Sequence, residues 1–330
     1  MISRRAFLCS LGFVLLTVPA AAGPPAGKVL RVGVLYGFVL KFDPASNPID
    51  RALVEGLRAH GYELGRNIVI ESRSAQGNPE RLPALAAELV RLKVDVLITP
   101  ATLPTLAARE VTKTVPIVMF NTADPVATGI VASLGRPGGN VTGLSYNAAE
   151  ISAKRVQLLQ EAVAGLSRVA VLWNSTLKSM ALGFQQIEVA APSLGVTVQS
   201  VRVSSSDDFE QAFAAIGRGR PDGLIVLYGP LRGNDLPRIV EFVTQNKLPT
   251  VFELGQGVRG GGLMEFGPSS TDMARRVGAY VDKIANGTRP ADLPVEEPTR
   301  FELIVNLKAA RTMGLAIPQS LLLRADEVIQ

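Results

Sequence analysis

The stretch Arg31-Val-Gly-Val-Leu-Tyr36 decides the fold class, because it is a short apolar run that is directly followed by helical periodicity. Apolar residues then recur at helical spacing over residues 49–57, and Gly61 ends that helix. Further short apolar runs return at residues 94–98 and 117–120, each next to another helical pattern. Strands that alternate with helices of this length predict right-handed βαβ units and a parallel sheet.

From about residue 145 the same alternation starts again, which predicts a second doubly wound unit. A glycine-rich stretch and a proline-rich linker follow, with further helix and strand patterns, so we expect the chain to cross between the units more than once. The fold class is therefore α/β, with two doubly wound parallel-sheet lobes, a hinge and an interlobe cleft. Lobe 1 is assigned residues 29–144 and 268–290, and lobe 2 is assigned residues 145–267 and 291–330.

The composition is that of a folded chain with a large core, since 47% of the 330 residues are hydrophobic and 19% are charged. The net charge is +5, and loss of Arg4 and Arg5 with a leader would leave +3, without any Lys/Arg block. We therefore expect no nucleic-acid binding. The single cysteine, Cys9, lies in that leader, and the single histidine, His60, ends a helix, where a cation complements the dipole. These residues predict no disulfide, metal site or cofactor.

Residues 1–22 are expected to be a signal peptide that is cleaved near Ala22. Arg4-Arg5 precedes an apolar run over residues 11–18, and Ala20 and Ala22 have the small-residue spacing of a cleavage site. The run is too short to span a bilayer comfortably, which argues against a membrane anchor. The string Ser-Arg-Arg-x-Phe-Leu also has the form of a twin-arginine export signal, although paired arginines occur in ordinary secretory signals too. By either route we expect a soluble periplasmic protein.

Open parallel sheets bind ligands at the carboxyl ends of their strands, so the residues directly after each strand are the candidate site. In lobe 1 these are Tyr36, Thr99, Ala101, Thr102 and Asp124. A helix is expected to begin near Thr102, where free N–H groups and hydroxyls can hold a carboxylate; the alternative is a plain N-cap by Thr102. Asp124 precedes a proline and an expected helix, so it neutralises a ligand ammonium group, caps that helix, or does both.

In lobe 2 the comparable candidates are Asn174 and Tyr228, of which Tyr228 either contacts the ligand or packs on its own loop. Asn147 and Glu150 have the spacing of a capping box at the start of that lobe's first helix. The glycine-rich residues 135–140 fit neither a P-loop nor a dinucleotide fingerprint, and we interpret them as a surface turn. The sequence shows no acid/base pair, nucleophile elbow or metal-ligand spacing, so no catalytic or metal residue is assigned.

Several longer strings match one known family. The most specific are Ser133-Leu-Gly-Arg-Pro-Gly-Gly-Asn-Val-Thr-Gly143 and Arg324-Ala-Asp-Glu-Val328, and Gly56-Leu-Arg-Ala-His-Gly-Tyr62, Asp124-Pro-Val126 and Asn306-Leu-Lys-Ala-Ala310 add to them. In this order, from about residue 30 to the C-terminus, they resemble the ABC transporter substrate-binding family related to tryptophan- and tyrosine-binding lipoproteins. The resemblance implies a periplasmic-binding-protein type I fold.

It also implies a Venus-flytrap protein that buries an amino-acid-like solute on closure and delivers it to a membrane permease with a cytoplasmic ATPase. Thr102, Asp124 and Asn147 match positions that the family places near the cleft. After the first strand, where relatives have small or polar groups, this chain has Tyr36-Gly-Phe-Val-Leu40, which argues against an identical ligand.

We expect a monomeric binding protein that is not an enzyme. One alternative is a periplasmic sensory module that presents its closed form to a membrane receptor, because it would use the same lobes. The other is an exported hydrolase, which would need a nucleophile elbow such as Gly-x-Ser-x-Gly that the sequence does not contain.

Overall fold

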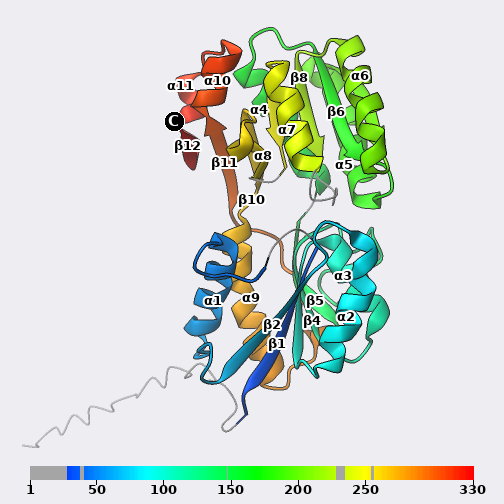
Figure 1. The fold of residues 1–330 in the computed structure, drawn as a ribbon, viewed down its shortest axis with the longest axis vertical. Coiled ribbons are helices and arrows are strands. Elements are labelled where there is room, and N and C mark those ends of the chain that lie inside the picture. The colour runs from blue at the N-terminus through cyan, green and yellow to red at the C-terminus, as the bar shows by residue number, and fades with distance from the viewer. Residues whose placement is uncertain (1–27, 38–40, 147, 228–234, 254–255) are drawn as a thin grey trace, which may run out of the picture.

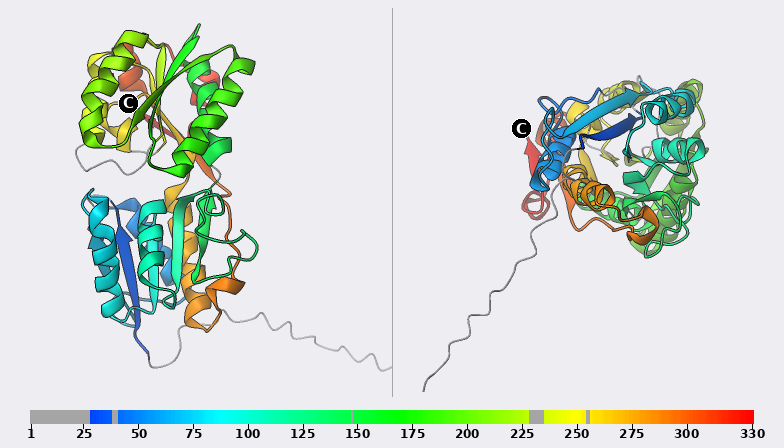
Figure 2. Two further views of the ribbon diagram at one scale, coloured as in Figure 1. Left: turned by 90° about the vertical axis from the view of Figure 1, so that its right-hand side faces the viewer. Right: turned by 90° about the horizontal axis from the view of Figure 1, so that it is seen from below.

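A computed structural model of the chain shows two α/β lobes placed end to end and joined by several connecting segments (Figures 1 and 2). The structure describes residues 28–330 except 38–40, 147, 228–234 and 254–255. Each lobe has its own sheet with helices on both faces. The prediction of two α/β lobes with parallel sheets is confirmed.

Lobe 1 has a parallel five-stranded sheet in the order β2-β1-β3-β4-β5. Its strands are β1 (Leu30–Tyr36), β2 (Ile68–Ser74), β3 (Val96–Pro100), β4 (Ile117–Ala123) and β5 (Val141–Tyr146). Its helices are α1 (Pro48–Ala59), the short η1 (Pro79–Arg81), α2 (Leu82–Arg91), α3 (Thr102–Val111), α9 (Ser270–Ala285) and the short η4 (Pro290–Asp292).

Alternate residues of the lobe 1 strands feed two separate cores, as the two-residue period of a strand requires. Val32 and Val34 pack under α1 and α9 together with Leu53 and Val277. On the opposite face, Leu35 and its neighbours pack under α2 and α3. The near-continuous apolar strands seen in the sequence are thus buried on both faces, as expected of a parallel sheet.

Glycines allow α1 and α9 to pack backbone against backbone. A Cβ added to Gly56 would lie 1.9 Å from the carbonyl oxygen of Arg275, and a Cβ added to Gly278 would lie 2.3 Å from the backbone of Gly56. This contact fixes α9, which is far along the chain, onto the first helix of lobe 1. The chain must therefore return from lobe 2 to complete lobe 1.

Lobe 2 has a seven-stranded sheet in the order β12-β11-β10-β9-β8-β6-β7. Its strands are β6 (Arg168–Asn174), β7 (Thr197–Val203), β8 (Gly223–Leu227), β9 (Thr250–Phe252), β10 (Met264–Pro268), β11 (Phe301–Asn306) and β12 (Glu327–Ile329). Its helices are α4 (Ala148–Ala162), α5 (Lys178–Ala190), η2 (Ala191–Leu194), η3 (Ser206–Asp208), α6 (Phe209–Gly219), α7 (Asp235–Gln245), α8 (Gln256–Gly260), α10 (Leu307–Met313) and α11 (Gln319–Leu322).

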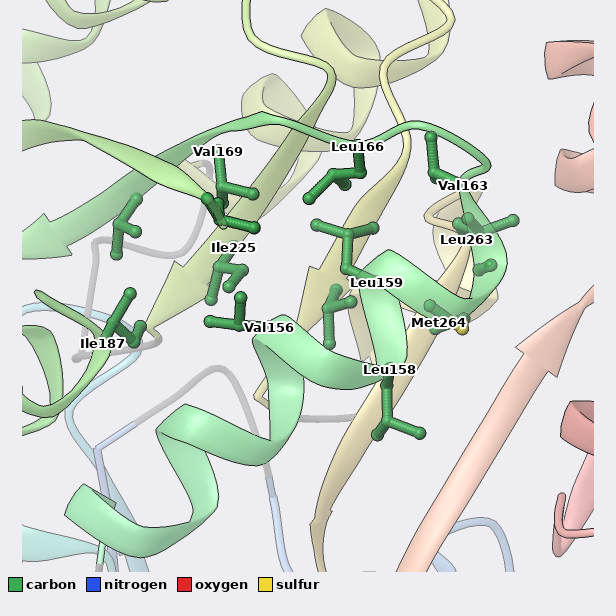
Figure 3. Packing of buried hydrophobic residues seen from close by; sticks show 14 of the residues in the cluster. Val156, Leu158, Leu159, Val163, Leu166, Val169, Ile187, Ile225, Leu263 and Met264 are labelled. Carbon is green, nitrogen blue, oxygen red and sulfur yellow. The ribbon is translucent and has the colours of Figure 1, made fainter. Parts of the chain in front are cut away.

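The lobe 2 sheet is parallel except between β10 and β11, which run antiparallel because the chain visits lobe 1 between them. Its larger core lies under α4 and α5. Val156, Leu159 and Leu263 belong to this core, as does Ile225 of the interior strand β8 (Figure 3). Burial of such a face supplies most of the stability of a helix in this setting.

Three segments connect the lobes. The first follows β5 into α4, the second joins β10 to α9, and the third leads from η4 to β11. Leu293 and Val295 of the third segment are core residues of lobe 1. In the structure the chain therefore enters lobe 2 after Glu296, a few residues beyond the boundary at 290/291 taken from the proline-rich linker.

Candidate functional site

The carboxyl ends of the two sheets face each other at the hinge. Tyr146, the last residue of β5 in lobe 1, donates a hydrogen bond of 3.0 Å to Oε1 of Glu253, which directly follows β9 in lobe 2. Ala123, at the end of β4, belongs to a small apolar cluster with Ile151 of lobe 2, and Phe266 of β10 packs against it. Ligand sites of open α/β sheets lie at these strand ends.

Threonine hydroxyls connect the ends of β3 and β4. Oγ1 of Thr99 and Oγ1 of Thr105 are 2.8 Å apart, and Thr105 also lies 3.4 Å from the hydroxyl of Thr122. Thr105 donates to the carbonyl of Ala101 at 2.8 Å. All three threonines are fully buried, so Thr99 positions the start of α3 from beneath rather than facing the space between the lobes.

The start of α3 differs from the N-cap alternative for Thr102. The N-cap position is Ala101, which makes no side-chain cap hydrogen bond, and Thr102 is the first residue of the helix. Oγ1 of Thr102 instead accepts a hydrogen bond from the backbone N–H of Ala123 at 3.2 Å. Thr102 thus joins α3 to the end of β4, and the first-turn N–H groups of Thr102 and Leu103 have no acceptor within the helix.

Left-handed backbone conformations concentrate at these strand ends. Ala101 has φ 108° and ψ 165°, Asn121 has φ 51° and Asp124 has φ 44°. Asparagine and aspartate tolerate this region, whereas the conformation of Ala101 is one that essentially only glycine adopts without strain. Such strain persists where the surrounding structure enforces it, and it is characteristic of binding sites.

Asp124 lies beside Tyr146, and its backbone N–H donates to the carbonyl of Tyr146 at 3.1 Å. Its own carbonyl accepts from the N–H and the hydroxyl of Thr128. The expected helix after Pro125 is wrong, because residues 125–131 form successive turns that include Gly129 at φ 75°. Asp124 therefore caps no helix, and of the two roles considered for it the ammonium-binding one remains a prediction.

Tyr36, at the end of β1, is buried and its hydroxyl is already engaged. It donates to Oδ1 of Asp50 at 2.5 Å, and the other oxygen of Asp50 accepts from the backbone N–H of Asp43. Burial, more than the neighbouring carboxylate, raises the pKa of Tyr36 far above its ordinary value. In this arrangement Tyr36 shapes the start of α1 and offers its hydroxyl to no ligand.

On the lobe 2 side, Asn174 is also committed to local structure. Its Oδ1 accepts from the backbone N–H of Thr176 at 2.9 Å and from the hydroxyl of the same residue at 2.7 Å. Asn174 thus orders the turn that leads into α5, whose N-cap residue Leu177 makes no side-chain cap. The two other predicted residues, Asn147 and Tyr228, lie outside the described residues.

Three residues at the base of the site were not predicted from the sequence. Tyr146 and Glu253 form the interlobe hydrogen bond given above, and Nη2 of Arg155 lies 3.6 Å from the same Glu253 oxygen. Burial raises the pKa of Tyr146 well above its ordinary value, and the Glu253 charge adds to this effect. Both Tyr146, the last residue of β5, and Glu253, the first residue after β9, lie at strand ends, so the rule of reading strand ends could have found them.

Four further observations concern the rest of the described chain. Within residues 28–330, gaps excepted, no group of three or more His, Cys, Asp or Glu side chains could hold a metal ion. His60 ends α1 as predicted, with Nδ1 3.7 Å from Oδ2 of Asp282. An open depression of about 440 Å³ in lobe 2 is lined by residues of β7 and α6 and by Ser175, which directly follows β6. In the same described residues no helix is long and apolar enough to cross a membrane.

Comparisons with known proteins extend over nearly the whole chain. The family model described as ABC transporter substrate binding protein matches residues 39–329. A tyrosine-binding protein of Clostridioides difficile (strain R20291) is 26% identical over 288 residues, which cover 86% of this chain and 82% of that protein.

Two solved structures are similar across both lobes. A conserved domain protein of Vibrio cholerae has a TM-score of 0.80 at 28% identity, with 91% of this chain and all of the other covered. An ABC domain from Streptococcus pneumonia in complex with L-Trp has a TM-score of 0.82 at 23% identity, with 92% and 100% covered. At that identity the second likeness shows the fold alone.

Proposed function

This chain belongs to the ABC transporter substrate binding protein family, and on that premise we propose that it binds an amino acid between its two lobes. Members of this family are solute-binding proteins that act outside the cytoplasm with ABC transporters, and they are not enzymes. The predicted family and the non-enzymatic role are thereby confirmed, and the exported hydrolase is not supported.

The observation that carries the amino-acid proposal is the pairing of two features at adjacent strand ends. The uncapped start of α3 presents the N–H groups of Thr102 and Leu103 at the positive end of a ten-residue helix, where a carboxylate is stabilised. The carboxylate residue Asp124 follows the neighbouring strand β4 and can neutralise an ammonium group. These two features complement the two charged groups of an α-amino acid.

The similar tyrosine-binding protein supports the same class of ligand, and we take L-tyrosine as the first solute to test. After the first strand, where relatives have small or polar groups, this chain has Tyr36-Gly-Phe-Val-Leu40, and this bulk argues against an identical ligand. We therefore propose that the ligand is an amino acid, and the binding screen described next identifies its side chain.

A thermal-shift screen of the twenty amino acids, followed by calorimetric titration of each hit, tests the proposal. A ligand that binds the native state alone stabilises it by RT ln(1 + [L]/Kd), about 2.7 kcal/mol at a hundredfold excess over Kd. We expect at least one amino acid to raise the melting temperature by several degrees. A screen without any amino-acid hit, or with turnover of a solute, would refute the proposed function.

Ligand analogues can assign the two charged groups of the solute separately. Asp124→Asn should weaken binding of the amino acid about tenfold, which corresponds to the ~1.4 kcal/mol of a charge-assisted hydrogen bond. The deaminated analogue should bind the parent and Asp124→Asn equally, because the partner of Asp124 is then absent. Asp222→Asn is the control. Asp222 lies directly before β8, at the amino end of the lobe 2 strands, so its substitution should leave the affinity unchanged. Equal losses for both ligands would exclude Asp124 as the ammonium partner.

We further propose that the chain is exported to the periplasm with residues 1–22 removed. There it acts as a monomer and delivers its solute to a membrane permease, which works with a cytoplasmic ATPase. Arg4-Arg5 and the short apolar run that follows support export, and both the twin-arginine and the ordinary secretory route fit them. N-terminal sequencing of the exported protein tests this point. A mature chain that still begins at Met1 would contradict it.

A further inference from the structure

Backbone hydrogen bonds join the third connection between the lobes to the other two crossing points. The backbone N–H of Ser145, in β5 just before the first connection, donates to the carbonyl of Glu296 in the third at 2.9 Å, beside a β-bridge between Leu144 and Glu296. The N–H of Ser269 in the second connection donates to the carbonyl of Arg300 in the third at 3.0 Å. A side chain that is bound to two of these connections can therefore influence the angle between the lobes.

Arg155 of α4 is such a side chain. It is fully buried, and its Nε donates to the carbonyl of Phe266, which leads into the second connection, at 2.9 Å. Its Nη1 lies 3.4 Å from Oγ of Ser152 on the same helix. A Cβ added to Gly267 would lie 3.9 Å from Nη2, so the guanidinium packs directly against the backbone of β10 just before the second connection.

Through Glu253 the same guanidinium reaches the end of β5, directly before the first connection. Nη2 of Arg155 is 3.6 Å from Oε1 of Glu253, and that oxygen accepts the hydroxyl of Tyr146 at 3.0 Å. Tyr146 belongs to β5 of lobe 1, whereas Glu253 and Arg155 belong to lobe 2. The network thus crosses from one lobe to the other at the point where they are joined.

The geometry of the network depends on the lobe angle. Nη2 of Arg155 is buried and makes no hydrogen bond within the described part of the chain, because Glu253 lies beyond hydrogen-bond distance from it. A rotation that moves Tyr146 with lobe 1 changes how Oε1 of Glu253 is shared between the hydroxyl and the guanidinium. A buried ion pair of this kind adds little net stability compared with apolar packing, so a role in fixing geometry fits it better.

We propose that Arg155 is a positioning residue of the hinge, which sets through Glu253 how Tyr146, and with it lobe 1, is held against lobe 2. Arg155 acts through other residues and contacts no solute. The inference rests on the proposed function in one respect, since lobe closure is what retains the solute, and differential affinity for the closed state drives that closure.

The interlobe distance in the solute-free protein tests the proposal. Spin labels on Glu80→Cys in lobe 1 and Lys178→Cys in lobe 2, both exposed positions, report the distribution of lobe separations by electron resonance, with Cys9→Ser as background. Tyr146→Phe removes the interlobe hydrogen bond without changing side-chain size, and Arg155→Lys keeps the charge but loses the fork that reaches Phe266 and Glu253.

Tyr62→Phe is the matched control. Tyr62 is also buried and donates to Oδ1 of Asp282 at 3.2 Å, but both residues lie inside lobe 1. We expect Tyr146→Phe and Arg155→Lys to displace or broaden the distance distribution beyond the width of the parent, and Tyr62→Phe to reproduce the parent. Superimposable distributions for all variants, or an equal change in Tyr62→Phe, would overturn the proposal. If Arg155→Lys does not fold, Tyr146→Phe carries the test.

The measurement uses no solute, so it separates the hinge from the ligand. Failure of every amino acid to bind would refute the proposed function. The interlobe distances would still test the role of Arg155 in positioning the hinge. Normal binding of L-tyrosine with unchanged distances would refute the role of Arg155 alone.

Discussion

Replacing Ala101 by glycine should stabilise the protein, which is the opposite of the usual effect of that substitution. Ala101 has φ 108° and ψ 165°, a conformation that costs a non-glycine residue about 1–3 kcal/mol. Glycine lowers stability by about 0.4–1 kcal/mol because it gives the unfolded chain more freedom. The middle of these two ranges gives a gain of roughly 1 kcal/mol in the free energy of unfolding.

Urea unfolding followed by circular dichroism measures this gain as a higher midpoint at unchanged slope. Ala84→Gly is the control, because Ala84 is exposed in α2 of the same lobe and glycine there costs about 0.5–1 kcal/mol. The added freedom before Thr102 should also weaken solute binding several-fold, since the N–H groups of α3 are then less firmly placed. If Ala101→Gly loses as much stability as Ala84→Gly, residue 101 is not strained and the reasoning is refuted.

Two further predictions concern stability. Gly56→Ala should cost about 1–3 kcal/mol, because its Cβ would lie 1.9 Å from the carbonyl oxygen of Arg275 and separate α1 from α9; an unchanged melting temperature would contradict the packing. Burial raises the pKa of Glu265 to about 8, so the folded state binds more protons than the unfolded one between the ordinary glutamate pKa and 8, and stability falls as pH rises through that window. Glu265→Gln should therefore exceed the parent in stability by on the order of 1–2 kcal/mol at about pH 9 and differ less at about pH 5; a difference independent of pH would exclude this explanation.

Most of the fold could be predicted from the sequence because strand and helix periodicities differ and parallel sheets are buried on both faces. The runs at residues 31–36 and 117–120 became β1 and β4, and the restart of the pattern gave the second lobe. The antiparallel β10–β11 pair could not be predicted, because it follows from the excursion of α9 into lobe 1. That excursion depends on Gly56 and Gly278, whose contact joins distant parts of the chain.

Less of the candidate site could be predicted, because strand-end positions are local whereas side-chain partners are not. The sequence indicated that Tyr36 and Thr102 follow strands, but their hydroxyls bond to Asp50 and to the backbone of Ala123. The helix expected after Asp124 was wrong because glycines and prolines in the following segment favour turns.

The hydrogen-bonded network of Tyr146, Glu253 and Arg155 at the hinge could not be predicted from the sequence. Tyr146 and Glu253 are 107 residues apart in sequence, and Arg155 lies on a helix whose apolar periodicity gives no sign of a buried cation. Such pairs arise from how the two sheets face each other, which local patterns do not encode.

Hydrogen exchange with and without a saturating amino acid tests the central claim, a binding site that both lobes share, most directly. L-tyrosine is the first solute, or whichever amino acid the thermal screen identifies. We expect the solute to slow exchange at residues 101–103 of lobe 1 and, in the same sample, at residues 174–177 of lobe 2. Slowed exchange in one lobe alone, or in neither of these segments while the solute is bound, would contradict it.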